Sequence, residues 1–116
     1  MSKATAQPDY RDSLHRDVAE TAQAVIAGTL GPIDAARRFV GLAAELNALD
    51  EEAFLFFLGL DSESDHFPLG AVREQWSESA LEREDRERRD YEARVRDEAV
   101  KNCEGLLSKY STSATE

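Results

Sequence analysis

The chain has 116 residues, of which 33% are charged and 41% hydrophobic, and its formal net charge is −10. This composition is typical of one globular domain with a single core rather than of a disordered chain. The acidic balance argues against binding to nucleic acid or to an anionic membrane, because phosphate contacts require clustered Lys and Arg. An acidic surface instead suits a basic protein partner.

Targeting and cofactor signals are few. The longest apolar run covers residues 53–60, which is too short to cross a bilayer. The first eight residues contain no apolar signal core, so we expect a cytoplasmic protein. The single cysteine, Cys103, excludes an internal disulfide. Phosphate-binding glycine motifs and Cys/His metal spacings are absent from the sequence, so we expect no cofactor and no metal.

The first half of the chain predicts two helices. Apolar residues at helical spacing extend from about Asp9 to Gly28 and from Pro32 to about Asn47. Gly28 and the Gly31-Pro32 pair separate the two segments, and proline suits the first turn of a helix. The second helix is apolar over a wide face, so we expect it to be well buried.

A third helix is predicted after Asp50. Leu49 precedes this residue and Phe54 follows it by four positions, which is the spacing of a hydrophobic staple around an N-cap. The adjacent acids Glu51 and Glu52 would complement the positive end of the helix. Residues 54–60 are apolar on nearly every side, so they should form the centre of the core. A buried strand is the alternative interpretation of so short an apolar run.

The fourth helix is predicted to be long. Ser77 is the expected N-cap, with Trp76 before it and Leu81 four residues after it, and neither glycine nor proline follows until Gly105. Acidic residues precede basic ones at i,i+4 spacing six times between residues 82 and 101, which would support a solvated helix. We expect this helix to end at about Tyr110, so the fold class is all-α, a compact bundle of about four helices.

The length of the fourth helix constrains its placement. From residue 77 to residue 110 it would span about 50 Å, whereas a compact chain of this size has a radius of gyration of about 13 Å. The helix must therefore project, kink or lie along a second subunit, so a homodimer is one possibility. We expect the charged residues 82–90 to stand off the body, a single domain over residues 9–110, and disordered ends over 1–8 and 111–116.

No lysine or arginine occurs between Arg38 and Arg73. We call residues 39–72 the acidic segment, because they include seven acids: Glu45, Asp50, Glu51, Glu52, Asp61, Glu63 and Asp65. Three of these acids are already explained as groups at the start of the third helix. The others gather at Glu45 and in the loop from Asp61 to Gly70, which is the candidate site.

The loop does not match a calcium site. Its alternate carboxylates at Asp61, Glu63 and Asp65 imitate the start of an EF-hand loop, but the sixth position is His66 and the twelfth is Val72. An EF-hand requires glycine and a bidentate acid there. We therefore expect these residues to turn the chain, with Asp61 or Glu63 pairing with Arg73.

Three apolar residues of this region have two interpretations each, and His66 is a candidate general acid. Phe67 and Leu69 flank the Pro68 turn and either anchor the loop on the core or offer an apolar contact to a partner. Trp76 is open to the same two interpretations. His66 lies among carboxylates and has the chemistry of a general acid, but no nucleophile is placed beside it by the sequence.

The segment from Leu60 to Trp76 resembles a segment found in an uncharacterised family of small bacterial proteins. The shared elements are the Asp-Ser-Glu run from Asp61, His66, the Pro-Leu-Gly turn, Arg73 and Trp76. This resemblance implies no activity. In size, charge and helicity the chain also resembles small acidic immunity proteins, which block a toxin by direct binding.

The sequence favours a non-enzymatic interaction module, such as an immunity or inhibitor protein, that binds a basic partner through the acidic loop. Two alternatives stay open: a small enzyme or metal-dependent domain that uses Glu63, Asp65 and His66, with Arg73 orienting an anionic substrate, and a self-associating structural subunit. The candidate partner-binding residues are Glu45, Asp61, Glu63, Asp65, His66, Phe67, Arg73 and Trp76.

Overall fold

The computed structural model describes residues 2–68 and 70–115. They form helices α1 (Ser2–Ala27), α2 (Pro32–Leu46), α3 (Glu52–Glu63) and α4 (Glu78–Thr115), with the 3₁₀ helix η1 (Gly70–Gln75) between α3 and α4. No strand occurs among these residues. The all-α prediction is therefore confirmed, and the alternative of a buried strand at residues 54–60 is excluded.

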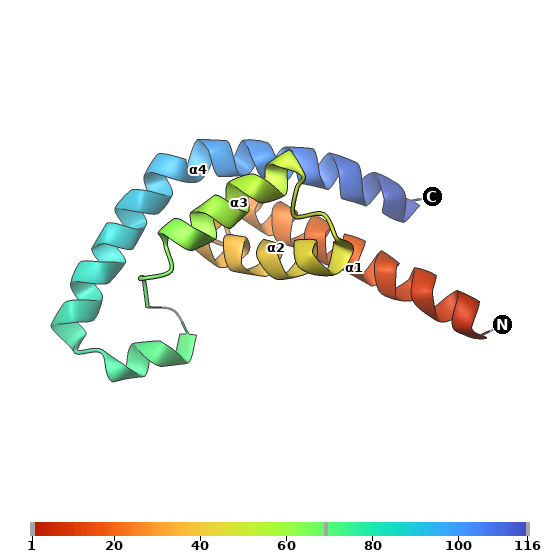
Figure 1. Ribbon diagram of the computed structural model, residues 1–116. Helices are drawn as coiled ribbons and strands as arrows, with labels where there is room; N and C mark the ends of the chain where they lie inside the picture. Colours follow the sequence, from red (N-terminus) through yellow and green to blue (C-terminus); the bar gives the residue numbers. More distant parts are fainter. Residues whose placement is uncertain (1, 69, 116) are drawn as a thin grey trace.

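The four helices form a bundle with a projecting arm (Figure 1). The second half of α4 lies antiparallel to α1, and α2 and α3 form a helical hairpin beside them. Residues 70–90, comprising η1 and the first turns of α4, form the arm. The molecule measures 57 × 29 × 24 Å with a radius of gyration of 15.9 Å, above the value of about 13 Å for a compact chain. The prediction that the charged start of the last helix stands off the body is confirmed.

Both terminal helices are longer than the sequence indicated. The first begins at Ser2 rather than about Asp9, and the last continues to Thr115 rather than about Tyr110. The division into a 9–110 domain with disordered ends stays a prediction. Within the described ranges, no helix combines the length and the apolar character that crossing a membrane requires.

The core is built from one stripe of each helix. Phe39 of α2 and Phe57 of α3 have ring centroids 4.6 Å apart, and Phe54 lies 5.9 Å from both Phe39 and Tyr110. Such tilted and edge contacts are the preferred geometries of aromatic pairs. Around these rings, α1 and α4 contribute the buried residues Leu14, Val18, Ala22, Val25, Ala99, Cys103 and Leu106. The helical spacing of apolar residues predicted for the first helix is confirmed at the positions that α1 contributes.

One turn of α4 holds the connection between α1 and α2. Gly28 adopts φ +84°, a conformation that glycine reaches without strain, and closes the end of α1. The Arg96 guanidinium donates to the carbonyl oxygen of Val25 at 3.3 Å. One turn earlier on α4, a carboxylate oxygen of Glu92 accepts from the backbone N–H of Ile33 at 3.1 Å. The positive Arg96 thus lies at the negative C-terminal end of α1, and the negative Glu92 lies at the positive N-terminal end of α2.

The N-cap of α2 is supplied from outside the helix. Its N-cap residue, Gly31, has no side chain to cap with, and Glu92 takes over that role. A Cβ atom at Gly31 would lie 2.6 Å from the Glu92 carboxylate. The glycine at this position is therefore explained by the approach of Glu92, because the backbone angles of φ −74° and ψ 158° suit any residue.

The predicted start of the third helix is wrong by one residue. The N-cap of α3 is Glu51, not Asp50, and no side chain caps this end. Asn47 takes the left-handed conformation at the end of α2, and the next residue, Ala48, is buried. Ala48 takes the buried position of this turn, and Leu49 is 37% exposed. The predicted staple is therefore not formed, because Leu49 does not pack in the core beside the buried Phe54.

The start of α4 agrees with the sequence. The Ser77 hydroxyl accepts from the backbone N–H of Ala80 at 3.3 Å, as an N-cap does. The predicted i,i+4 ion pairs are wrong, however. None of the ion pairs among the described residues joins two residues of α4, and Asp85 binds Arg73 outside the helix instead. Solvent satisfies the exposed charges of the helix surface at little energetic difference.

Removal of the Glu92 cap should destabilise the fold. We expect Glu92→Ala to lower the free energy of unfolding by about 1 kcal/mol, the usual effect of losing an N-cap. Gly31→Ala should have about the same effect, because its methyl group displaces the same carboxylate. The double variant should be little worse than either single variant, as for two residues of one interaction. Urea unfolding of all three variants measures this, with Glu98→Ala as the exposed control on α4. Additive losses would show that Gly31 and Glu92 act independently.

Candidate functional site

The end of α3 is fastened by Arg37 of α2. The Ser64 side chain is fully buried, and its hydroxyl donates to the carbonyl oxygen of Leu60 at 2.7 Å. The Ser64 carbonyl oxygen accepts from the Arg37 guanidinium at 2.7 Å, and the same guanidinium pairs with Asp61 at 3.2 Å. Asp61 is thus bound within the chain. The prediction that it pairs with Arg73 is wrong.

Beyond Ser64 the chain turns inward at Phe67. This residue is 6% exposed, so its ring anchors the loop, as one of the two interpretations predicted. The ring lies 4.1 Å from that of His66 and 6.2 Å from that of Tyr91 on α4. The Phe67 ring therefore packs between the exposed His66 and Tyr91 and has little exposed surface. Leu69, the other predicted anchor, lies outside the described residues.

Glu63 also has a partner within the chain. The Tyr91 hydroxyl donates to its carboxylate at 2.8 Å. Burial, and after it the bond to Glu63, raises the pKa of Tyr91 to about 12. The phenol therefore stays protonated at neutral pH and acts as a donor. Asp65, by contrast, is exposed and has no hydrogen bond or ion pair with the described part of the chain.

Arg73 ties η1 to α4 rather than to the acidic segment. Its guanidinium contacts both carboxylate oxygens of Asp85, at 2.7 and 2.8 Å, and donates to the Pro68 carbonyl oxygen at 3.2 Å. The hydrogen bond with Arg73 lowers the pKa of Asp85, and the same bond raises the pKa of Arg73. Because the Arg73 guanidinium is already bound to Asp85, it does not extend toward a substrate as the enzyme alternative requires.

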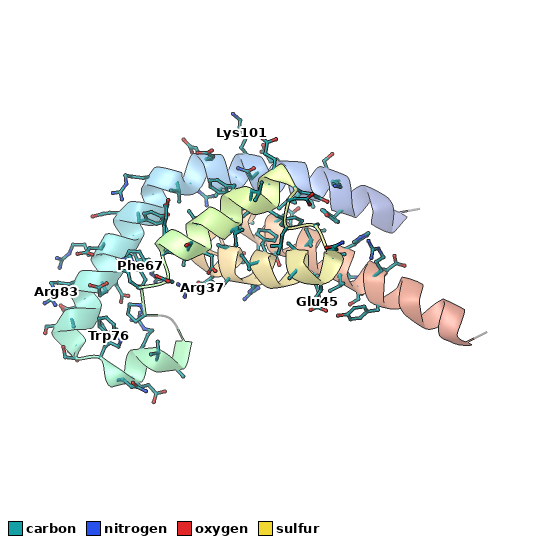
Figure 2. All side chains as sticks on the ribbon, viewed as in Figure 1. Arg37, Glu45, Phe67, Trp76, Arg83 and Lys101 are labelled. Carbon is teal, nitrogen blue, oxygen red and sulfur yellow. The ribbon has the colours of Figure 1, made fainter. Side chains whose placement is uncertain are left out.

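The predicted site residues do not form one patch. Figure 2 shows Arg37 and Phe67 on the side of the bundle that faces the arm, whereas Glu45 lies far along α2. The Tyr10 hydroxyl donates to the Glu45 carboxylate there. Trp76 lies on the arm and is 38% exposed. The structure brings together Asp61, Glu63, His66 and Phe67, and it separates them from Glu45 and Trp76.

A hollow of about 420 Å³ lies between the loop and the first half of α4. Its lining combines carboxylates with one imidazole and one guanidinium: Glu63, His66, Phe67, Glu87, Asp90, Tyr91 and Arg94. None of these residues is a serine or a cysteine, and the one hydroxyl of the lining, that of Tyr91, is bound to Glu63. No set of three or more His, Cys, Asp or Glu side chains within the described ranges is placed to bind a metal ion.

Cys103 lies away from this hollow, in the core. It is fully buried in α4, and burial raises the pKa of its thiol to about 12. A protonated, enclosed thiol is a poor nucleophile, so Cys103 acts as a packing residue of the core.

Two features of the surface were not predicted. Arg37 could have been found, because Arg37 and Asp61 are equally far in sequence from Leu49, the middle of the α2–α3 connection, and an antiparallel hairpin places such residues side by side. Leu55 and Leu58 are 50% and 37% exposed. The sequence could not indicate this, because the helix is apolar on nearly all sides and the pattern does not distinguish its buried face.

Comparisons with known proteins do not assign the chain to a family. The chain matches no protein-family model, and neither curated proteins nor solved structures give a significant match. The resemblance of residues 60–76 to a family of small bacterial proteins therefore stays a prediction, as does the likeness to immunity proteins.

The Arg37 contacts should be required for the loop to pack. We expect Arg37→Gln to lower the free energy of unfolding by about 1–3 kcal/mol, because the buried Ser64 carbonyl loses its charged donor. Urea unfolding measures the loss, and Arg38→Gln is the matched control, since Arg38 is exposed and adjacent. Equal stability of the two variants would contradict the role given to Arg37.

The contact between Arg73 and Asp85 should open in acid. Because the folded pKa of Asp85 lies below its ordinary value of 3.8, the contact stabilises the folded state above that value. Its contribution is lost as the pH falls through the lower, folded pKa. Hydrogen exchange of the amides of residues 71–76 should therefore show stable protection down to about pH 4 and loss below it. Asp85→Asn should remove the pH dependence, and an unchanged profile in this variant would refute the assignment.

Proposed function

We propose that the chain is a non-enzymatic interaction module that binds a basic protein partner through its acidic segment. The observation that carries this proposal is uncompensated charge. Of the seven acids, Asp61 pairs with Arg37 and Glu51 with Lys109. The other five have no ion-pair partner among the residues that the structure describes.

The uncompensated acids lie on the hairpin of α2 and α3 and in the loop that follows it. Asp50, Glu52 and Asp65 are exposed, and no hydrogen bond to their side chains occurs within the described ranges. Their charges are therefore available to an incoming cation at no cost to the fold. Opposite charge on a partner would speed the encounter and make it sensitive to salt.

An immunity or inhibitor protein is the form of module that we favour. Such proteins act by covering a partner, which needs a rigid surface rather than a catalytic group. The Arg37 contacts and the buried Phe67 ring supply that rigidity at the acidic end of α3. The proposal includes the cytoplasmic location predicted from the sequence, where the buried Cys103 thiol would stay reduced.

The enzyme alternative and the structural-subunit alternative receive less support. Glu63 and His66 share the hollow beside α4, but Arg73 is bound to Asp85 and does not line it. A dimer through the last helix would need an apolar face on the projecting arm, and the arm carries mainly charged residues. Both alternatives stay predictions.

Neutralising the unpaired acids should weaken partner binding without unfolding the chain. We expect the triple variant Asp50→Asn, Glu52→Gln, Asp65→Asn to capture at least tenfold less basic protein from native host cells at ~0.05 M salt. Quantitative mass spectrometry of the captured proteins, at low salt and at ~0.5 M salt, measures the difference.

The matched control carries the same charge change on the arm: Glu74→Gln, Glu78→Gln, Glu82→Gln. All three of these residues are exposed. It should capture the partner as the unchanged chain does. Recovery of no salt-sensitive basic protein, or equal losses in both triple variants, would refute the proposed function.

A further inference from the structure

The outer face of α3 is unusual for an exposed helix surface. Residues at a spacing of three and four form one stripe along it, and each member is exposed: Glu52, Leu55, Leu58, Gly59 and Ser62. Leu55 is 50% exposed and Leu58 37%. The opposite face of the same helix carries the buried Phe54, Phe57 and Leu60, so α3 is apolar on two sides and only one of them is covered.

Gly59 is not required by crowding within the chain, a feature that it shares with the helix glycines Gly41 and Gly105. A Cβ atom at this position would meet nothing within 4 Å. Glycine in a helix interior destabilises it by about 1 kcal/mol relative to alanine, and neither a turn nor a close approach inside the molecule explains that cost. A glycine between exposed leucines gives a second helix room to cross at a short interaxial distance, about 8 Å.

The charges around the stripe define what covers it. Asp50 and Glu52 lie at one end of α3 and Asp65 beyond the other, and the acidic segment contains no lysine or arginine. The cations that α4 brings to this helix are Lys109, which pairs with Glu51, and Lys101, which lines a hollow with Glu52. A second copy of the chain would bring the same acids and a net charge of −10, so it is repelled. An anionic membrane is repelled for the same reason. The matching surface has apolar residues in its middle and Lys or Arg at both ends.

We propose that the outer face of α3 binds a basic amphipathic helix of the partner, with Leu55 and Leu58 as the apolar contacts and Gly59 at the crossing point. The partner helix lays its apolar side on the leucines, a known mode of helix recognition. Its basic residues lie about 18 Å apart, one α3 length, where they meet the acids at both ends. This inference rests on the proposed function and names the partner's chemistry.

The test uses a synthetic helical peptide of about four turns, with leucines along one side and lysines on its flanks. Binding to the full chain is measured by fluorescence anisotropy, and the binding site by changes in backbone NMR shifts. We expect saturable binding that weakens with salt and shift changes centred on residues 52–62. A peptide with glutamate in place of lysine should bind at least tenfold more weakly.

Two variants and one matched control locate the contact. Gly59→Gln places a side chain in the crossing point, and the variant Leu55→Gln, Leu58→Gln removes the apolar contacts; each should weaken peptide binding at least tenfold. Gly105→Gln is the control, because Gly105 is also an exposed helix glycine with open space around it. It should bind as the unchanged chain does. Circular dichroism and thermal unfolding verify that all three variants are folded.

Several outcomes would overturn the inference: no peptide binding, shift changes away from α3, equal losses for Gly59→Gln and Gly105→Gln, or preferential binding of anionic vesicles. The proposed function can survive such a failure. A basic partner that the acidic triple variant loses and that Gly59→Gln retains would support the function and reject this surface. Peptide binding at α3 without any basic partner in the host would support this surface and reject the proposed function.

Discussion

The register of α4 along the bundle is the constraint on which the other elements depend. Glu92 and Arg96 fix that register, because they bind the two helix ends of the α1–α2 connection within one turn of α4. With the register set, Tyr91 meets the end of α3, and Tyr110 donates to Glu51 at its start at 3.1 Å. Asp85 then lies beside η1, where it binds Arg73. One long helix thus contacts every connection that the structure describes, which compensates for the absence of capping side chains on α2 and α3.

This arrangement determines which acids are available at the surface. Glu51 and Glu63 are used by α4, through Lys109 and Tyr91, and Asp61 is used by α2. These contacts position the ends of α3 and leave Leu55 and Leu58 exposed between them. The helix that is held most firmly at both ends is therefore also the helix that presents the exposed leucines. A rigid exposed face loses little conformational entropy when a partner binds it.

The sequence predicted elements that depend on local periodicity and missed those that depend on tertiary geometry. Helical stripes such as the one through Leu14 and Val18 repeat within one helix, so their burial followed from spacing alone. The Ser77 cap is equally local. Arg73 was assigned to Asp61 or Glu63 because it is the first cation after the acidic segment, but a guanidinium on a flexible stem selects among acids by distance in space, and it binds Asp85. Glu92 gave no signal at all, because its role arises from the meeting of α4 with a helix end 59 residues away.

Departures from local consistency are informative when they coincide. A sequence that specifies its fold usually agrees with local propensity, hydrophobic pattern and charge balance at each position, and exceptions concentrate where function requires them. Along the outer face of α3, three exceptions occur within four turns: a glycine without a steric reason at residue 59, exposed leucines at 55 and 58, and acids without ion pairs at both ends. Each would be minor alone, and an alanine, a glutamine or a lysine would remove it. The docking of a basic amphipathic helix, as we propose, would relieve all three together.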